Sequence, residues 1–357
     1  MSRLNSIFLL AASLFALAAH ASDQVTPPPQ RQALLITGAT LHTVSGATIE
    51  NGRMLVEGGR IRAIAAPGET LPAAATGPAA VLDLRGRHIY PGFIAANSAI
   101  GLVEVEAVRA TIDTTEIGVI NPNVRALVAV NADSELLPVA RSNGVLAALA
   151  VPGSSAFGSI AGTSALLQID GWTWEDMALV REVGLHVVLP TMRTNSDVLK
   201  GSLEPFKDEV RKLSAQRLQM IDQAFDAAAA YARARAAEPD KTPLDLRWEA
   251  MLSVVKGERT VFVHANEAAQ IRHAMGLAER HGLKLVIVGG ADAARFAPVL
   301  KARGVAVVIG GVHNLPLRPD DAFDARMSIV FLYTGATSEI LTQRQLIMAQ
   351  FNRDRNE

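Results

Sequence analysis

The hydrophobic pattern of the chain changes its period once, and this change separates a strand-rich first part from a mixed α/β second part. Residues 33–66 alternate between apolar and polar positions in short runs, which is typical of strands with one buried face. Two pairs interrupt these runs, Asn51-Gly52 and Gly58-Gly59, and such pairs favour tight hairpin turns. The pattern therefore predicts a small antiparallel meander, with a strand signal that continues through residues 80–95.

After residue 92 the apolar runs become continuous and alternate with helical segments. A continuous apolar run is typical of a strand that is buried on both faces. Strand-helix units at this spacing predict a parallel sheet with crossover helices. The strands are expected within residues 144–152, 164–171, 184–190, 260–266, 283–290 and 305–311, and the helices within 203–238, 267–282 and 292–304.

Such a sheet is either an open doubly wound sheet or a closed barrel. No glycine-rich dinucleotide fingerprint opens any of the expected helices, and this absence argues against a dinucleotide-binding fold. We therefore expect an α/β protein with a (β/α)8 TIM-type barrel, whose ligands bind at the C-terminal ends of the strands.

Composition and charge narrow the function classes. The 357 residues are 49% hydrophobic and 19% charged, which is typical of a globular protein. With 34 basic and 35 acidic residues the net charge is −1, so no basic bias points to a nucleic-acid partner. The chain has no cysteine, which excludes thiol catalysis and cysteine-bound zinc.

The first 32 residues predict export. Arg3, an apolar stretch over residues 7–19 and the small residues Ala19 and Ala21 match a secretory signal peptide over residues 1–21, cleaved before Ser22. An uncleaved membrane anchor is the alternative, but the stretch is shorter than the ~20 residues that span a bilayer. A proline-rich linker follows over residues 22–32. We expect a periplasmic or secreted protein with no stable membrane anchor after cleavage.

Several phrases of the sequence together resemble the amidohydrolase superfamily, and in particular the imidazolonepropionase-like amidohydrolases. They include LITGATLHTVSG, VLDLRGRHIYPGFI, GTSALLQIDGWTWEDM and VFVHANEAAQI. The resemblance implies a metal-dependent (β/α)8 barrel with a small β-sandwich built from both chain ends. It also implies hydrolysis of non-peptide carbon-nitrogen bonds, such as those of cyclic amides, by water that a divalent metal activates. On this basis residues 33–88 form the sandwich part, 89–340 the barrel, and 341–357 an atypical C-terminal tail.

The metal ligands that the resemblance implies are mostly replaced. Asn97 and Ala99 stand where the family has two histidines after the first barrel strand. Gly289 or Gly290 stands where it has a histidine after the sixth strand, and His264 after the fifth strand is retained. A catalytic zinc needs about three protein ligands and an open position for water. His264 is therefore either a metal ligand or acid-base group at the barrel mouth, or a hydrogen-bonded core histidine.

Two functions from different classes follow. The first is a hydrolase of carbon-nitrogen bonds that uses a divalent metal such as zinc, and the second is a metal-free, non-catalytic relative that binds a small molecule or a partner. The substrate-binding candidates are Asn97, Arg141 and His313. Arg141 can alternatively brace the second strand, and His313 can be an ordinary loop residue. His273 and His281 are expected at the surface. An incomplete barrel leaves an open sheet edge, so a homo-oligomer is also expected.

Overall fold

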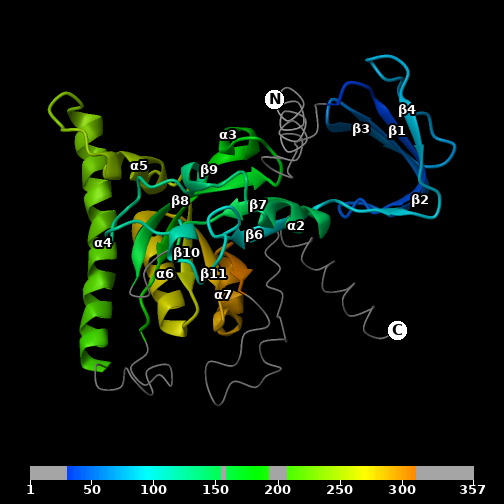
Figure 1. Cartoon of the computed structure of the whole chain (residues 1–357). Coiled ribbons are helices and arrows are strands. Elements are labelled where there is room, and N and C mark those ends of the chain that lie inside the picture. Colours follow the sequence, from blue (N-terminus) through cyan, green and yellow to red (C-terminus); the bar gives the residue numbers. More distant parts are fainter. Residues whose placement is uncertain (1–29, 154–157, 193–206, 311–357) are drawn as a thin grey trace, which may run out of the picture. The chain divides into compact units, whose positions relative to one another are not determined.

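The computed structural model describes residues 30–153, 158–192 and 207–310 (Figure 1). These residues form two compact units, each described below by itself. The first unit comprises residues up to 41 together with 49–88, and the second comprises 42–48 together with the chain from residue 89 onward. The signal segment, His313 and the predicted tail lie outside the described residues.

The first unit is a five-stranded sheet. β1 pairs with β2 in antiparallel fashion and with β4 in parallel fashion, so the strand order is β3-β2-β1-β4, and β5 also pairs with β1. The predicted meander is thus confirmed. The strands are β1 (Leu34–Leu41), β2 (Ile49–Glu57), β3 (Arg60–Ala65), β4 (Ala80–Asp83) and β5 (His88–Ile89).

The two predicted hairpin turns have different outcomes. Gly58 and Gly59 join β2 to β3 with φ values of +57° and +72°, as a tight turn with two left-handed residues requires. The turn predicted at Asn51-Gly52 is wrong, because both residues lie inside β2. Asn51 has φ +48°, and the pairing of β1 with β2 shifts register nearby, so this pair forms an irregularity within the strand.

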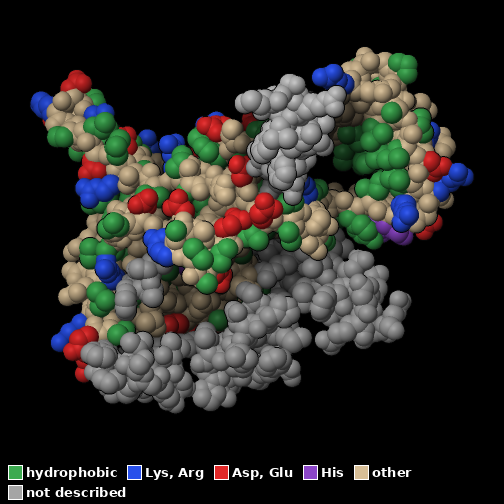
Figure 2. Space-filling model, in the orientation of Figure 1, with side chains coloured by type: hydrophobic (Ala, Val, Ile, Leu, Met, Phe, Trp, Pro, Cys, Tyr) green, Lys and Arg blue, Asp and Glu red, His purple; other side chains and the backbone are tan. Residues whose placement is uncertain are grey.

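An apolar row crosses the sheet of the first unit. Ile64 pairs with Met54, Met54 with Ile36, and Ile36 with Leu82, so these four side chains lie on one face. Ile36 and Met54 are buried, whereas Ile64 and Leu82 at the two ends of the row are 40% and 42% exposed. Hydrophobic side chains are visible on this unit in Figure 2.

The second unit is built on a seven-stranded sheet, in which the strands follow one another in sequence order from β6 to β12. The predicted alternation of strands and helices is confirmed from β9 to β12, where helical residues separate each parallel strand from the next. The strands are β6 (Phe93–Ser98), β7 (Val145–Ala150), β8 (Ser159–Gln168), β9 (Ala178–Val188), β10 (Thr260–Ala265), β11 (Lys284–Gly289) and β12 (Ala306–Ile309).

One strand departs from the parallel pattern. β6 and β7 are parallel, and β9 to β12 are parallel, but β8 is antiparallel to both β7 and β9. Residues 151–158 connect β7 to β8, and they are too few for the crossover of about a dozen residues that a parallel pair needs. β7, β8 and β9 therefore form an antiparallel meander within an otherwise parallel sheet.

Helices cover the outer face of this sheet. Val187, Val263 and Ile287 from three neighbouring strands share one buried cluster with Phe225 and Leu277 from two helices. The predicted long helix is confirmed as α4. The helical segments are η1 (Arg109–Thr111), η2 (Ala126–Ala129), α2 (Leu136–Ser142), α3 (Trp174–Met177), α4 (Lys207–Ala237), α5 (Leu246–Val255), α6 (Ala268–His281), η5 (Ala293–Phe296) and α7 (Ala297–Ala302). None of the described helices has the length and apolar character needed to cross a membrane.

The inner face of the sheet carries a second apolar cluster, which shows that the sheet curls. Leu149 and Val151 from the end of β7 join Phe262 of β10 and Val288 of β11 in this cluster. β7 and β10 are not neighbours in the sheet, because β8 and β9 lie between them. Side chains from these two strands share a cluster because the sheet bends around its inner face, as in a barrel.

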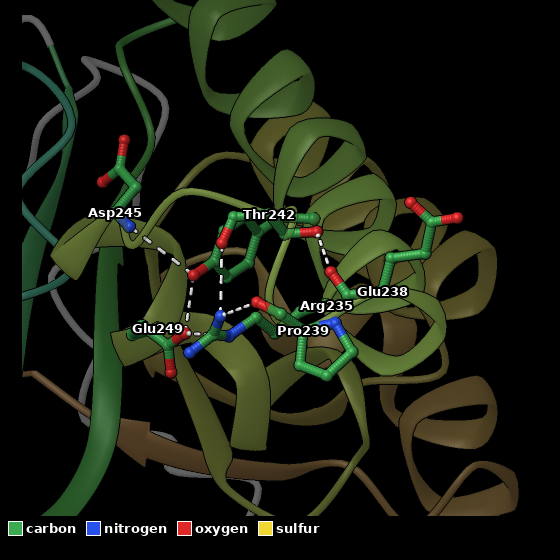
Figure 3. A network of polar contacts seen from close by, with 7 residues as sticks. Arg235, Glu238, Pro239, Thr242, Asp245 and Glu249 are labelled. Atoms are coloured by element: carbon green, nitrogen blue, oxygen red, sulfur yellow. Dashed lines mark hydrogen bonds and ion pairs between the residues drawn. The ribbon is translucent and has the colours of Figure 1, made fainter.

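A polar clasp holds α4 and α5 together at the end of the long helix (Figure 3). The Tyr231 hydroxyl donates to Glu249 Oε1 at 2.6 Å, and Arg235 Nε lies 3.3 Å from the same oxygen. Arg235 also donates to the backbone oxygens of Pro239 and Thr242 in the connecting loop. We call these contacts the α4–α5 clasp, and they fix the loop that returns the chain to the sheet.

Two histidines of α6 bind α4 instead of facing solvent. His273 Nε2 lies 2.9 Å from Asp222 Oδ1, and its side chain is only 18% exposed. His281 Nε2 lies 3.5 Å from Asp226 Oδ1, and the His281 ring packs against Phe225. The expectation that both are surface residues is therefore wrong, because the side of α6 that carries them packs against the long helix α4.

Candidate functional site

Two histidines from neighbouring strands meet on the inner face of the sheet. His186 lies on β9 and His264 on β10, and His186 Nδ1 is 2.9 Å from His264 Nε2. In the parallel register His186 pairs with Phe262, and His264 pairs with Val188. His264 is thus one layer nearer to the C-terminal end of the strands, which is the end where barrel enzymes bind their ligands. We call these two residues the histidine pair.

The Phe262 ring packs against the His186 ring of the histidine pair. The two rings are stacked, with the centroids 4.7 Å apart and the planes within 7° of each other. Gly184 leaves the space for this ring, because a Cβ at Gly184 would lie 2.4 Å from Phe262 Cε2. The absence of a side chain at Gly184 therefore lets Phe262 fix the orientation of the His186 ring.

Burial keeps both imidazoles neutral at pH 7. His186 is 1% exposed, and burial lowers its pKa well below the usual value for an imidazole, with a further lowering from the neighbouring His264. Burial alone lowers the pKa of His264 to about 4. Desolvation disfavours the charged form of an imidazole, and a second imidazole at hydrogen-bonding distance disfavours it further.

The two outer nitrogens of the pair have different surroundings. His186 Nε2 is buried and has no hydrogen-bond partner among the described residues. His264 is half-buried, and no hydrogen bond joins its Nδ1 to another residue in the described part of the chain. This nitrogen is not among the fully buried unpartnered atoms either, so it keeps some exposed surface. The outer nitrogen of His186, Nε2, is therefore enclosed by the protein, whereas the outer nitrogen of His264, Nδ1, is partly exposed.

The polar residues that follow β10 stabilise the start of α6. The Glu267 carboxylate accepts hydrogen bonds from the Thr191 hydroxyl at 2.7 Å and from the Met192 backbone at 2.9 Å. Asp292 accepts from the backbone N–H of Ala268, the first residue of α6, at 2.9 Å. Carboxylates near a helix N-terminus are stabilised by its unpaired N–H groups and its dipole. Both carboxylates at this edge of the sheet thus have structural partners.

The residues present do not fit the zinc that the resemblance implies. His264 Nε2 is hydrogen-bonded to His186, so it is not free to coordinate a metal in this arrangement. Gly289 and Gly290 have φ values of +99° and +63°, a left-handed conformation that favours glycine, and neither has a side chain that could bind a metal. The described ranges contain no group of three histidine, cysteine or carboxylate side chains that could hold a metal.

The other predicted site residues are placed as follows. Asn97 is exposed near the end of β6, at the same end of the sheet as His264. Arg141 at the end of α2 donates to the Ile169 carbonyl at 2.9 Å and lies 3.2 Å from the Asp170 carboxylate. These contacts match the bracing alternative for Arg141. The substrate-binding roles of Asn97, Arg141 and His313 stay predictions.

Sequence reasoning missed His186, which contacts the one retained histidine. His186 lies in a run of apolar residues that predicted a strand buried on both faces, and its neighbours Leu185 and Val187 are fully buried on the outer face. A polar residue inside such a run was the available signal, because a buried polar group needs a partner. The run itself did not show that this partner is His264.

Comparisons with known proteins agree with this architecture. No family model and no curated protein matches the chain. An amidohydrolase from Thermotoga maritima, known from its crystal structure, is similar to it with a TM-score of 0.67 and 23% identity, over 80% of this chain and 72% of that chain. The resemblance to the amidohydrolase superfamily is thus confirmed for the fold, which is an α/β barrel whose seven described strands nearly close.

Two further solved structures are weakly similar. One is a prolidase bound to N-methylphosphonate-L-proline, with a TM-score of 0.39 and 14% identity over 78% of this chain and 66% of that chain. The other is an N-acyl-D-glutamate deacylase from Bordetella bronchiseptica with zinc and a phosphonate inhibitor, with a TM-score of 0.32 and 17% identity over 78% and 58%. At these scores neither adds to the argument.

Proposed function

We propose that this chain is an exported protein with the amidohydrolase fold that binds a small molecule at the C-terminal end of its barrel strands, without a metal-activated water. The surroundings of His264 carry the proposal, because its Nε2 is hydrogen-bonded to His186 and no group of three possible metal ligands forms among the described residues. The glycines at positions 289 and 290, where the resemblance implies a histidine, support it independently, because glycine has no side chain that can bind a metal. Binding in barrels of this kind takes place at the strand ends, where His264 presents an open nitrogen.

The test combines metal analysis with ligand screening. Purified protein is equilibrated with zinc, freed of unbound metal and analysed, and it is then screened by thermal shift against cyclic amides and acyl-amino acids with and without a chelator. We expect far less than one zinc per chain, and a ligand-induced rise in melting temperature that the chelator does not change. Near-stoichiometric zinc that the variant His264→Ala loses would overturn the proposal.

Metal-dependent hydrolysis of carbon-nitrogen bonds is the second candidate. The similarity of the fold to an amidohydrolase and the retained His264 favour it. It requires that a metal ion bind His264 through Nδ1, or replace the hydrogen bond to His186 at Nε2, and recruit further ligands. A chelator-sensitive release of ammonia or amine from the same compounds, absent in His264→Ala, would establish it in place of binding.

Export is proposed from the signal pattern at residues 1–21. Expression with the native N-terminus and mass spectrometry of the exported protein test it directly. We expect a mature chain that begins at Ser22. Full-length protein retained inside the cell would contradict export.

A further inference from the structure

We propose that His186 is a positioning residue, which fixes the ring and the tautomer of His264 so that His264 Nδ1 offers a single hydrogen-bonding role to an uncharged ligand. The ligand part of this inference rests on the proposed function. The positioning part rests on the geometry of the histidine pair alone.

The geometry leaves His186 little freedom. Its ring is stacked on Phe262, it is buried, and its Nδ1 is held 2.9 Å from His264 Nε2. The His264 ring lies between Val188 and Val288, its register partners on the two neighbouring strands. These apolar neighbours offer no hydrogen bond, so the contact with His186 orients the His264 ring.

The hydrogen bond couples the two ring tautomers. A neutral imidazole has one N–H donor and one acceptor nitrogen. If His186 Nδ1 donates, His264 Nε2 accepts and the proton of His264 is on Nδ1, so the open nitrogen is a donor. If His264 Nε2 donates, its open Nδ1 is an acceptor. Each arrangement leaves His186 Nε2 unpartnered, as a lone pair in the first and as an N–H in the second.

The two arrangements differ in free energy because His186 Nε2 is buried without a hydrogen-bond partner. A buried polar atom without a partner is costly, and the cost differs between a bare nitrogen and an N–H group. One tautomer of the pair is therefore favoured over the other, and the preference is transmitted through the hydrogen bond to His264 Nδ1. An isolated surface histidine has no such coupling and exchanges its tautomers freely.

The surroundings favour an uncharged ligand over an anion. Burial lowers the pKa of both histidines of the pair, and the two acidic side chains at this edge, Glu267 and Asp292, accept hydrogen bonds from backbone N–H groups. A carboxylate that loses its water here would find no compensating cation on the pair. An amide or another uncharged polar group needs only a single complementary hydrogen bond from His264 Nδ1.

The positioning role is tested without a ligand, by NMR of the full chain labelled with 15N in its histidines at about pH 7. The variants are His186→Leu and His186→Asn, which have similar shapes. Only Asn keeps a hydrogen-bonding atom near the position of His186 Nδ1. We expect the ring nitrogens of His264 to show one tautomer in the native protein and an averaged mixture in His186→Leu, and also in His186→Asn, because the Asn amide can present either its oxygen or its N–H to His264. An averaged mixture in the native protein, or one tautomer in His186→Leu, would overturn the positioning role.

The ligand class is tested with acetamide and acetate, which share a shape and differ in charge. We expect acetamide to shift the His264 ring resonances at concentrations at least about tenfold lower than acetate does. Equal or tighter binding of acetate would overturn the ligand class alone. Binding of neither probe, to a protein that shows the single tautomer, would overturn the ligand class and count against the proposed function, while the positioning role would stand.

Discussion

Replacing Gly184 by alanine should destabilise the protein, because the new methyl group meets atoms that have little room to move. Its Cβ would lie 2.4 Å from Phe262 Cε2 and 2.7 Å from the Thr260 backbone oxygen. The Thr260 oxygen is part of the backbone of the neighbouring strand β10 and cannot move easily. The Phe262 ring must therefore shift, and this ring is stacked on His186. Overpacking of this kind costs about 1–3 kcal/mol.

A second glycine provides the matched control. Gly276 lies in the middle of α6, and the nearest atom to a Cβ built there is Arg280 Nη1 at an ordinary 3.5 Å. Alanine is a better helix former than glycine by about 0.5–1 kcal/mol, so Gly276→Ala should stabilise the protein by roughly this amount. The two substitutions are chemically identical, and the structure assigns them opposite signs.

Urea unfolding followed by circular dichroism measures both effects on one scale. Gly184→Ala should lower the free energy of unfolding by about 1–3 kcal/mol, and Gly276→Ala should raise it. A Gly184→Ala variant as stable as the native protein would mean that Phe262 does not occupy the space above Gly184. The described support of the His186 ring would then be wrong.

Three further substitutions or conditions test other parts of the structure. Lowering the pH should destabilise the protein, because His264, with a folded pKa of about 4, resists the protonation that the unfolded chain undergoes near 6.5. The free energy of unfolding starts to fall below about pH 6.5, and His264 alone accounts for a loss of about 3 kcal/mol near pH 4. The midpoint of urea unfolding measures this loss. A midpoint that stays constant down to about pH 5 would contradict the burial of His264. Tyr231→Phe should speed hydrogen exchange of the backbone amides in the first turn of α5, because Glu249 loses the hydroxyl group that donates to it. Unchanged exchange would show that this hydrogen bond does not hold the α4–α5 clasp. Arg141→Met should cost about 1 kcal/mol in unfolding free energy, as a part-buried carbonyl loses its donor, whereas Arg85→Met in an exposed ion pair should have no measurable effect; equal losses would refute this distinction.

Most of the second unit could be predicted from the sequence, because its strands have a strong local signal. The runs around Val263 and Ile287 are mostly apolar, and the helix between them ends in a basic residue followed by glycine, at His281-Gly282. Gly282 has φ +64°, as a left-handed helix C-cap requires. These signals depend on a few neighbouring residues and need no tertiary information.

The direction of β8 could not be predicted in the same way. Residues 159–162 precede the strand expected within residues 164–171, but they belong to the buried strand β8. An apolar run has no direction of its own, so only the pairing with β7 and β9 shows that the strand is reversed. The prediction of a hairpin turn at Asn51-Gly52 was wrong for a related reason, because residues that favour a turn can also form an irregularity within a strand.

The candidate site shows the same division between local and tertiary information. The position of His264 at a strand end followed from the resemblance to a known family and the strand pattern. Its partner, His186, is 78 residues away in the sequence, and their contact depends on the register of two parallel strands. The choice between a metal ligand and a hydrogen-bonded histidine therefore needed three-dimensional structure.

The reversed strand β8 also affects the order in which the barrel can assemble. β7, β8 and β9 follow one another closely along the chain, so their ladders close only short loops and can form while later segments are still being synthesised. The ladder between β9 and β10 must instead wait for α4 and α5 to emerge. We expect this meander to fold early. β10, β11 and β12 then pair with it after α4 and α5 have formed.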